Sequence, residues 1–301
     1  MKFSKTFSIG SGLKLIWAAV GVGLGLRMLQ MLLCFDYATG FYTDGGLTAA
    51  LSLLLPLGGA ALAGLMCRRS RRAFGENPPG KSPLAGALAL GCGAVLLYTG
   101  AVLLGDYLSF QSGGPSQYKS VQQSWVHLPF LGACLVFGAV QLYTAAGLFT
   151  GKDGMKRVPL LYLTGVLWGA GYLVLTYVFY SSSPSLVENF FMVVGGGALL
   201  MGLFYLCRIF AGVDVPGAML RLFVMGGGAA VLVIPHHGGD LLLLLMGKTY
   251  QGEMPPLLQL CGLLTACFLL ALMTSCRRTA VDPAQDGAPQ EPRHFETGGG
   301  E

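Results

Sequence analysis

Long apolar segments alternate with short polar ones along most of the chain. An α-helix needs roughly 20 apolar residues to cross about 30 Å of hydrocarbon. The apolar runs are continuous, whereas the strands of a membrane barrel are short and alternate apolar with polar residues. The pattern therefore predicts an all-α fold, a polytopic transmembrane helix bundle of about eight spans, at residues 13–34, 46–67, 83–105, 127–149, 158–180, 189–211, 217–237 and 255–276.

Two segments do not fit the spanning pattern. Residues 241–245 are apolar but too short to span, which predicts an interfacial or re-entrant piece after the seventh span. Residues 277–301 contain three prolines and few apolar side chains, so they are predicted to form a disordered cytoplasmic tail. Residues 1–276 form the predicted transmembrane helical bundle.

The Lys and Arg residues predict how the chain is threaded. If the N-terminus is cytoplasmic, Lys119 and Lys248 lie outside and Arg27 lies within the membrane, while the other 16 of the 19 basic residues lie at or beyond cytoplasmic helix ends. Basic residues concentrate on the cytoplasmic side of membrane proteins. Both termini are therefore predicted to be cytoplasmic.

The composition excludes a soluble domain. Hydrophobic residues make up 53% of the chain and charged residues 11%, with a mean hydropathy of +0.63. A soluble domain carries about 25% charged residues. The lipid bilayer is thus the expected partner, and no nucleic-acid partner is expected. A homo-oligomer or a protein partner stays open.

A basic run follows the second span. Within a Debye length of an anionic leaflet, each basic residue contributes about 1 kcal/mol of attraction. The run therefore predicts either contact with anionic lipid or an anchor of topology alone, and its basic residues are Arg68, Arg69, Arg71 and Arg72.

The 46 glycines suggest how the helices pack. Small residues four apart let membrane helices approach closely, as expected for Gly21-xxx-Gly25 and Ala89-xxx-Gly93. Pro56, Gly195–Gly197 and Gly226–Gly228 lie within spans, where a helix break for ligand binding is an alternative to simple packing.

Arg27 is the most informative polar residue, because an arginine in the bilayer core is costly. Gly23, Arg27, Gln30 and Cys34 share one helix face, which predicts that this face is directed into the bundle. Arg27 either contacts a ligand or ion, or it snorkels or pairs structurally with Asp36 or Glu188.

A second polar face lies on the fifth span, where Gly165, Gly169, Tyr172 and Thr176 follow helical spacing. Most polar side chains within spans fall in the predicted outer half, and the acidic residues fall in outer loops or at their edges. These observations predict a cavity that opens outward with Arg27 as its positive element, and no deep pair of acidic residues. The candidate ligand-binding residues are Arg27, Gln30, Tyr172, Thr176 and Glu188.

Three histidines could either bind a metal ion or lie solvated at the membrane interface. His127, His236 and His237 are all expected at the outer boundary, with Asp240 nearby. Adjacent histidines diverge by about 100° on a helix, so one ion would need a broken turn at Pro235 or Gly238–Gly239. Solvated interfacial histidines are the simpler interpretation, and no metal or other cofactor is predicted.

No sequence motif indicates an enzyme. The chain has no H-E-x-x-H, G-x-S-x-G or Walker motif, and its eight cysteines form no C-x-x-C pair. The cysteines are expected to act as small apolar residues. No catalytic residue is predicted, although an enzymatic role stays open.

Two segments carry a family resemblance. Arg27–Gln30 leading into Phe35–Phe41, and Pro184–Asn189 at the start of the sixth span, resemble a group of bacterial multi-span membrane proteins with no assigned activity. The resemblance implies a multi-pass protein of the bacterial plasma membrane.

Two functions fit these features. The first is a small-molecule or ion carrier, or a membrane subunit of one, indicated by glycine-rich spans and a buried arginine. The alternative is a membrane sensor or scaffold with an outward-facing ligand cavity and no transport activity, indicated by the outward bias of polar groups. A carrier needs polar groups at both half-depths, whereas a receptor needs them on one side.

Overall fold

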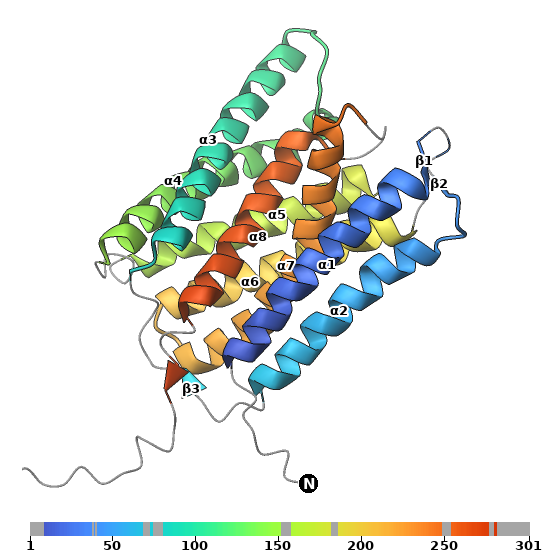
Figure 1. The fold of residues 1–301 in the computed structure, drawn as a ribbon. Helices are drawn as coiled ribbons and strands as arrows, with labels where there is room; N and C mark the ends of the chain where they lie inside the picture. The colour runs from blue at the N-terminus through green and yellow to red at the C-terminus, as the bar shows by residue number, and fades with distance from the viewer. Residues whose placement is uncertain are drawn as a thin grey trace, which may run out of the picture.

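A computed structural model describes residues 9–37, 39, 41–68, 73–74, 81–151, 158–181, 186–248, 254–276 and 280–281. Within these residues, eight helical segments are long and apolar enough to cross a membrane, and they form one bundle (Figure 1). The predicted fold class is confirmed, and the protein is a multi-pass helical membrane protein. The helices are α1 (Ile9–Leu33), α2 (Leu47–Arg68), α3 (Pro83–Gln111), α4 (Ser124–Thr150), α5 (Leu163–Leu175), α6 (Leu186–Phe210), α7 (Val215–Leu245) and α8 (Pro256–Cys276).

Short elements complete the fold. The fifth span is α5 extended by a 3-10 turn, η3 (Pro159–Tyr162), and by a π-helical turn, η4 (Thr176–Tyr180). A 3-10 turn, η1 (Lys119–Gln122), precedes α4. The strands β1 (Phe35–Asp36) and β2 (Phe41–Tyr42) form an antiparallel hairpin between α1 and α2.

One further strand pair involves the C-terminal region. β3 (Ala73–Phe74), which follows α2, pairs antiparallel with β4 (Ala280–Val281), which follows α8. Residues 280–281 belong to the segment predicted to be a disordered tail. The other residues of that segment lie outside the described residues.

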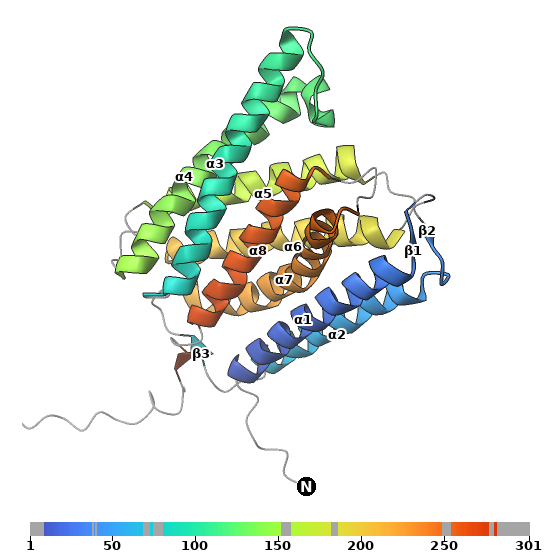
Figure 2. The same ribbon diagram turned by 45° about the horizontal axis from the view of Figure 1, so that its top comes forward.

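α7 lies at the centre of the bundle. It packs against α1, α2, α6 and α8, while α8 also packs against α3. The α1–α2 pair and the α3–α4 pair lie at opposite edges (Figure 2). A helix that is apolar all round is expected to be buried on all sides, and α7 carries a continuous buried run from Ala229 to His237.

The outer faces of the peripheral helices are apolar. On α2, five leucines are exposed at the surface of the bundle: Leu51, Leu54, Leu55, Leu62 and Leu65. Exposed apolar surface on this scale is incompatible with water. The lipid bilayer therefore surrounds the bundle.

α7 corrects the predicted end of the seventh span. Residues 241–245 are its last turns rather than a separate interfacial or re-entrant piece, and the helix continues through Pro235 and Gly238–Gly239. A proline removes one N–H donor, and its ring needs space beside the helix. Gly23 of α1 provides that space, because a Cβ at Gly23 would lie 2.9 Å from the Pro235 ring.

The other suspected helix breaks are also wrong. α2 continues through Pro56, α6 through Gly195–Gly197, and α7 through Gly226–Gly228. An irregular turn occurs instead at η4, at the end of the fifth span, and no proline or glycine within η4 signals it in the sequence.

Small residues allow close packing at some of the predicted positions. A Cβ at Gly93 of α3 would lie 2.9 Å from the backbone oxygen of Gly138 on α4, so the two helices meet backbone to backbone. At Gly21 and Gly25, in contrast, no atom of another described helix lies within 4 Å of such a Cβ. The predicted Gly21-xxx-Gly25 contact is therefore wrong.

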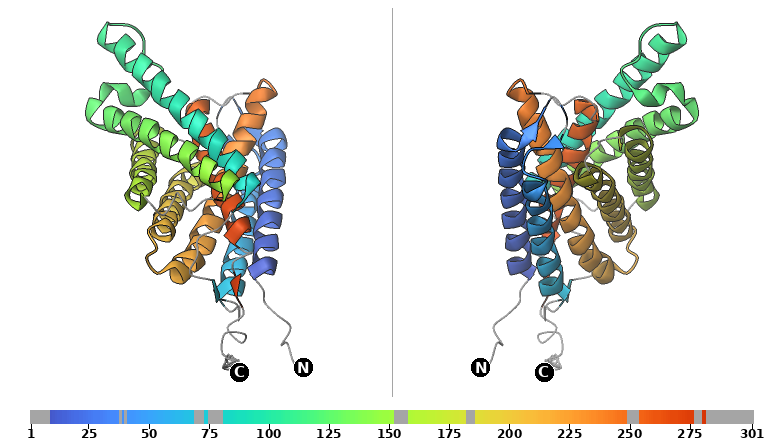
Figure 3. Two further views of the ribbon diagram at one scale, coloured as in Figure 1. Left: turned by 90° about the vertical axis from the view of Figure 1, so that its left-hand side faces the viewer. Right: turned by 90° about the vertical axis from the view of Figure 1, so that its right-hand side faces the viewer.

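The start of α1 and the end of α8 lie at the same end of the bundle (Figure 3), as an even number of spans requires. Arg68 at the end of α2 and Arg208 in the last turn of α6 lie at this end as well. Arg68 is exposed, while Arg69, Arg71 and Arg72 lie outside the described residues. That this end is cytoplasmic stays a prediction.

Candidate functional site

The site is built around Arg27 of α1, near the end of the bundle opposite the start of that helix. Its guanidinium forms a two-pronged ion pair with Glu188 of α6, with Nη1–Oε1 at 2.5 Å and Nη2–Oε2 at 2.8 Å. Both side chains are almost fully buried, with 2% and 3% of their surfaces exposed. Paired geometry of this kind satisfies both carboxylate oxygens and fixes the relative position of two helices.

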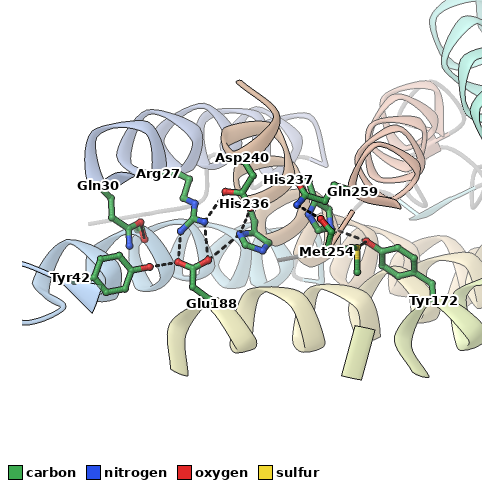
Figure 4. A network of polar contacts seen from close by, with 11 residues as sticks. Arg27, Gln30, Tyr42, Tyr172, Glu188, His236, His237, Asp240, Met254 and Gln259 are labelled. Atoms are coloured by element: carbon green, nitrogen blue, oxygen red, sulfur yellow. Dashed lines mark hydrogen bonds and ion pairs between the residues drawn. The ribbon is translucent and has the colours of Figure 1, made fainter. Parts of the chain in front are cut away.

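Two further groups join this pair (Figure 4). Arg27 Nη2 also donates to Asp240 Oδ1 of α7 at 2.8 Å. The Tyr42 hydroxyl of β2 donates to Glu188 Oε1. We call Arg27, Tyr42, Glu188, His236 and Asp240 the charged cluster, and it unites α1, α6, α7 and the β1–β2 hairpin.

Local structure explains how these side chains meet. The β1–β2 hairpin folds back over the end of α1, and Tyr42 is thereby brought to Glu188. Arg27 crosses α7 at Gly239, where a Cβ would lie 2.7 Å from Arg27 Cγ. The continuation of α7 beyond Pro235 places Asp240 one helical turn after His236.

The hairpin is anchored to α2 by Asp44. Its carboxylate accepts hydrogen bonds from the backbone N–H groups of Thr48 at 2.7 Å and Gly46 at 3.1 Å. These hydrogen bonds hold the pKa of Asp44 below its ordinary value. Asp44 thus caps the start of α2 and fixes the end of the hairpin that carries Tyr42.

Within the charged cluster, His236 lies on the side towards the middle of the bundle. Its Nδ1 lies 3.5 Å from Glu188 Oε2 and 3.6 Å from Asp240 Oδ2. The ring stacks on Phe191 at 5.4 Å between centroids, and Arg27 lies 6.0 Å from the centre of the same Phe191 ring.

A second polar group continues from the charged cluster. The His236 and His237 rings lie 5.1 Å apart, and His237 Nε2 is 2.9 Å from the Tyr172 hydroxyl of α5. Tyr172 approaches α8 at Gly262, where a Cβ would lie 2.5 Å from its hydroxyl oxygen. The two groups form a row of buried polar side chains from α1 to α5.

A cavity of about 250 Å³ opens beside the charged cluster. Arg27, Glu188 and Asp240 line its polar part, and Asp240 keeps 13% of its side chain exposed. The rest of the wall is mostly apolar, formed by Met31, Phe35, Leu241, Leu243, Leu244, Met254, Pro255 and Pro256, with Tyr37, Gln259 and Lys248 completing it.

Tyr37 and Lys248 are neighbours on the cavity wall. The Lys248 ammonium lies 5.9 Å from the centre of the Tyr37 ring, a cation–π arrangement. Partial burial raises the pKa of the Tyr37 hydroxyl, and the nearby positive charge of Arg27 opposes this change. The Tyr37 hydroxyl donates to the Met31 carbonyl at 2.9 Å, which ties this wall to α1.

The structure brings together only some of the five candidate ligand-binding residues. Arg27 and Glu188 are in direct contact and line the cavity. Tyr172 joins them indirectly, through His237 and His236. Gln30 instead accepts a hydrogen bond from Ser52 of α2 at 3.1 Å, and Thr176 donates to the Tyr172 carbonyl of its own helix at 2.7 Å.

The structure also corrects the predicted charge of the site. Arg27 is not an isolated positive element, because two carboxylates contact it. Glu188 lies in the first turn of α6 and Asp240 near the end of α7, at the edge of the bundle as predicted, but both contact the buried Arg27. Of the two structural partners considered for Arg27, Glu188 is in contact, and Asp240 takes the place expected for Asp36.

His127 does not join the other two histidines. It lies on α4, where its Nδ1 is 3.0 Å from Ser120 Oγ and its Nε2 is 3.1 Å from the Leu103 carbonyl oxygen. Among the residues that the structure describes, His, Cys, Asp and Glu form no group of three suited to a metal ion. His127 instead ties η1 to α3 and α4.

Sequence reasoning missed Tyr42, and it treated His236 and Asp240 only as a metal alternative. A sequence signal existed for the latter pair, since their i, i+4 spacing places them on one face of a continuous helix. The predicted end of the seventh span at residue 237 concealed that signal, because it placed Asp240 outside the helix.

Comparison of the chain with protein-family models, with curated proteins and with solved structures gives no match. The geometry of the site therefore carries the functional interpretation.

Proposed function

We propose that the protein is a small-molecule or ion carrier, or a membrane subunit of one, whose ligand binds in the cavity beside the charged cluster. The observation that supports this proposal most strongly is the position of Arg27, Glu188 and Asp240. These charged side chains from three helices meet at the wall of one cavity. Ionisable groups within membrane spans are costly, and they commonly mark substrate or ion pathways.

The cavity wall suggests what the ligand requires. A mostly apolar wall with a few charged groups at one end favours a small molecule with an apolar body and a polar end. Because three spans contribute charges to the cluster, a ligand that replaces one ion pair would change the contacts among α1, α6 and α7. Such a rearrangement is what alternating access needs.

A membrane sensor or scaffold without transport is the second candidate. Among the described residues, Arg27 and Glu188 are the buried Lys, Arg, Asp or Glu side chains, and both lie at the same end of the bundle. Polar groups at one end of the bundle suit a receptor, because a receptor binds its ligand from one side of the membrane and does not release it on the other. Binding without flux is the outcome that this candidate expects.

Native mass spectrometry of gently purified protein tests the shared part of both functions. We expect a small molecule to be retained by the wild type and lost from the L244W variant, since Leu244 lines the cavity. The L245W variant is the matched control, because Leu245 is adjacent, 84% exposed and not part of the wall. Retention of a polypeptide alone, with no small molecule, would overturn the stand-alone carrier.

Transport is then tested with the retained molecule in proteoliposomes. A carrier produces protein-dependent flux of that molecule, and the L244W variant reduces the flux while the L245W variant does not. Binding in the cavity without flux would overturn the carrier and favour the sensor.

A further inference from the structure

The charged cluster carries an excess negative charge. Arg27 supplies one positive charge, and Glu188 and Asp240, which both contact it, supply two negative charges. The Glu188 side chain is 3% exposed and the Asp240 side chain 13% exposed, so water in the cavity can reach Asp240 but hardly Glu188. An uncompensated buried charge costs several kcal/mol, and the site needs a further positive charge nearby.

His236 is placed to supply that charge. Its Nδ1 lies almost equally far from the two carboxylates, at 3.5 Å from Glu188 Oε2 and 3.6 Å from Asp240 Oδ2. His236 Nδ1 and Asp240 Oδ2 are both buried without a hydrogen-bond partner. An N–H on Nδ1 would turn this unsatisfied pair into a donor and an acceptor, with a shift of a few tenths of an ångström, and only the doubly protonated imidazolium would also cancel the excess charge.

Among the described residues, Lys248 is the other cation on the cavity wall, and its ammonium lies over the Tyr37 ring. Arg27 is already engaged by both carboxylates, and Phe191 covers one face of the His236 ring. The titratable and charged groups on the elements around His236 are Arg27 of α1, Tyr42 of β2, Glu188 of α6, His237 and Asp240 of α7, Tyr172 of α5 beyond His237, and Lys248 on the cavity wall.

We propose that His236, Glu188 and Asp240 form a site for a single proton, and that filling the cavity drives proton uptake at this site. The proton binds His236 Nδ1, and the charge of the cluster changes from one excess negative charge to zero. Asp240 is more exposed than Arg27, Glu188 or His236 and lines the cavity, which gives the proton a route from cavity water to the imidazole.

The link to the cavity follows from solvation. Water in the cavity stabilises the excess charge on Asp240, and an apolar occupant removes that water. The neutral, protonated cluster is then favoured. This inference deepens the proposed function and rests on it, because the proton is a coupling ion only if the protein is the proposed carrier.

The experiment is an NMR titration of ¹⁵N-histidine-labelled protein in lipid nanodiscs. The chain has four histidines, and the H236Q variant identifies the His236 signals. We expect His236 to gain a second N–H as the pH is lowered to about 5, the lower end of the range in which imidazole ordinarily changes its charge. A His236 that keeps a single N–H down to pH 5 would overturn the proton site.

Two variant pairs give the titration its controls. D240N removes one negative charge, and we expect the midpoint to move about one to three pH units lower. D106N is the matched control, because Asp106 is bound by Ser116 and Gln117 at the edge of the outer loop. An unchanged midpoint in D240N would overturn the shared site even if the wild-type His236 titrates.

The L244W variant is expected to raise the pH midpoint of the His236 titration, because its indole fills the cavity. The L245W variant should leave this midpoint unchanged. Equal midpoints in the wild type and L244W would overturn the link between cavity and proton. Failure of the proposed function is seen separately, as the absence of a retained molecule or of its flux, and it leaves the titration result standing.

Discussion

At the scale of single residues, Arg27 is the side chain on which the charged cluster depends. An ion pair between buried groups adds little net stability compared with apolar residues, yet removal of one partner leaves the other charge buried and unpaired. Arg27 has two such partners, Glu188 and Asp240. Its loss should therefore cost far more than the loss of an exposed arginine.

The R27M variant is predicted to lose about 3–5 kcal/mol of unfolding free energy. The triple variant R27M/E188Q/D240N should recover most of this loss, because no uncompensated charge remains. Denaturant unfolding in mixed micelles measures the difference. R208M is the control, since Arg208 forms an exposed ion pair with Asp214 at 3.3 Å and should cost less than about 1 kcal/mol. Equal losses in R27M and R208M would contradict the role given to Arg27.

At the scale of helices, backbone-to-backbone contact holds α3 against α4. A Cβ at Gly93 would meet Gly138 O at 2.9 Å and Leu142 Cδ2 at 2.8 Å. A backbone atom cannot move aside as the end of a long side chain can, so added volume here must separate the helices. Gly91 lies on the same helix with open space around it.

The G93A variant is accordingly predicted to be destabilised by about 1–3 kcal/mol, the usual cost of overpacking. G91A should be neutral or slightly stabilising, because alanine favours helix more than glycine does. Thermal unfolding of both variants in one detergent provides the comparison. A G93A variant as stable as G91A would show that α3 and α4 do not pack through these glycines.

The spans were predictable from sequence because lipid imposes a strong length requirement on apolar helices. The end of α7 was not, because a proline predicts a kink only if nothing accommodates its ring. Gly23, on a helix more than 200 positions earlier in the chain, provides that accommodation for Pro235. Contacts of this kind between distant segments leave no local signal.

The candidate site likewise combines features that the sequence predicted with features that it did not. The cost of an arginine in lipid predicted that the Arg27 face is directed into the bundle, and pairing with Glu188 was one of the alternatives considered for it. Tyr42 was not predictable, because it reaches Glu188 only through the fold of the β1–β2 hairpin. Gln30 and Thr176 share helix faces with site residues, yet their side chains bind Ser52 and the Tyr172 carbonyl instead.

At the scale of the whole molecule, the central claim is that a charged cluster within the bundle lies beside a cavity open to the outer side of the membrane. The bundle places the cavity at the end opposite the start of α1, and the distribution of Lys and Arg predicts that this end faces outward. A single cysteine on the cavity wall can test two things together, namely whether the cavity is open to water and which side of the membrane it faces.

The most direct measurement is labelling of the L244C variant, in a background without the eight native cysteines, by a membrane-impermeant thiol reagent. The predicted result is labelling from the outside of intact cells, which L244C/M31W should reduce because Met31 lines the same cavity. K81C, exposed at the opposite end before α3, should be labelled only after the cells are permeabilised. An L244C variant labelled only from the inside, or a K81C variant labelled in intact cells, would contradict the account.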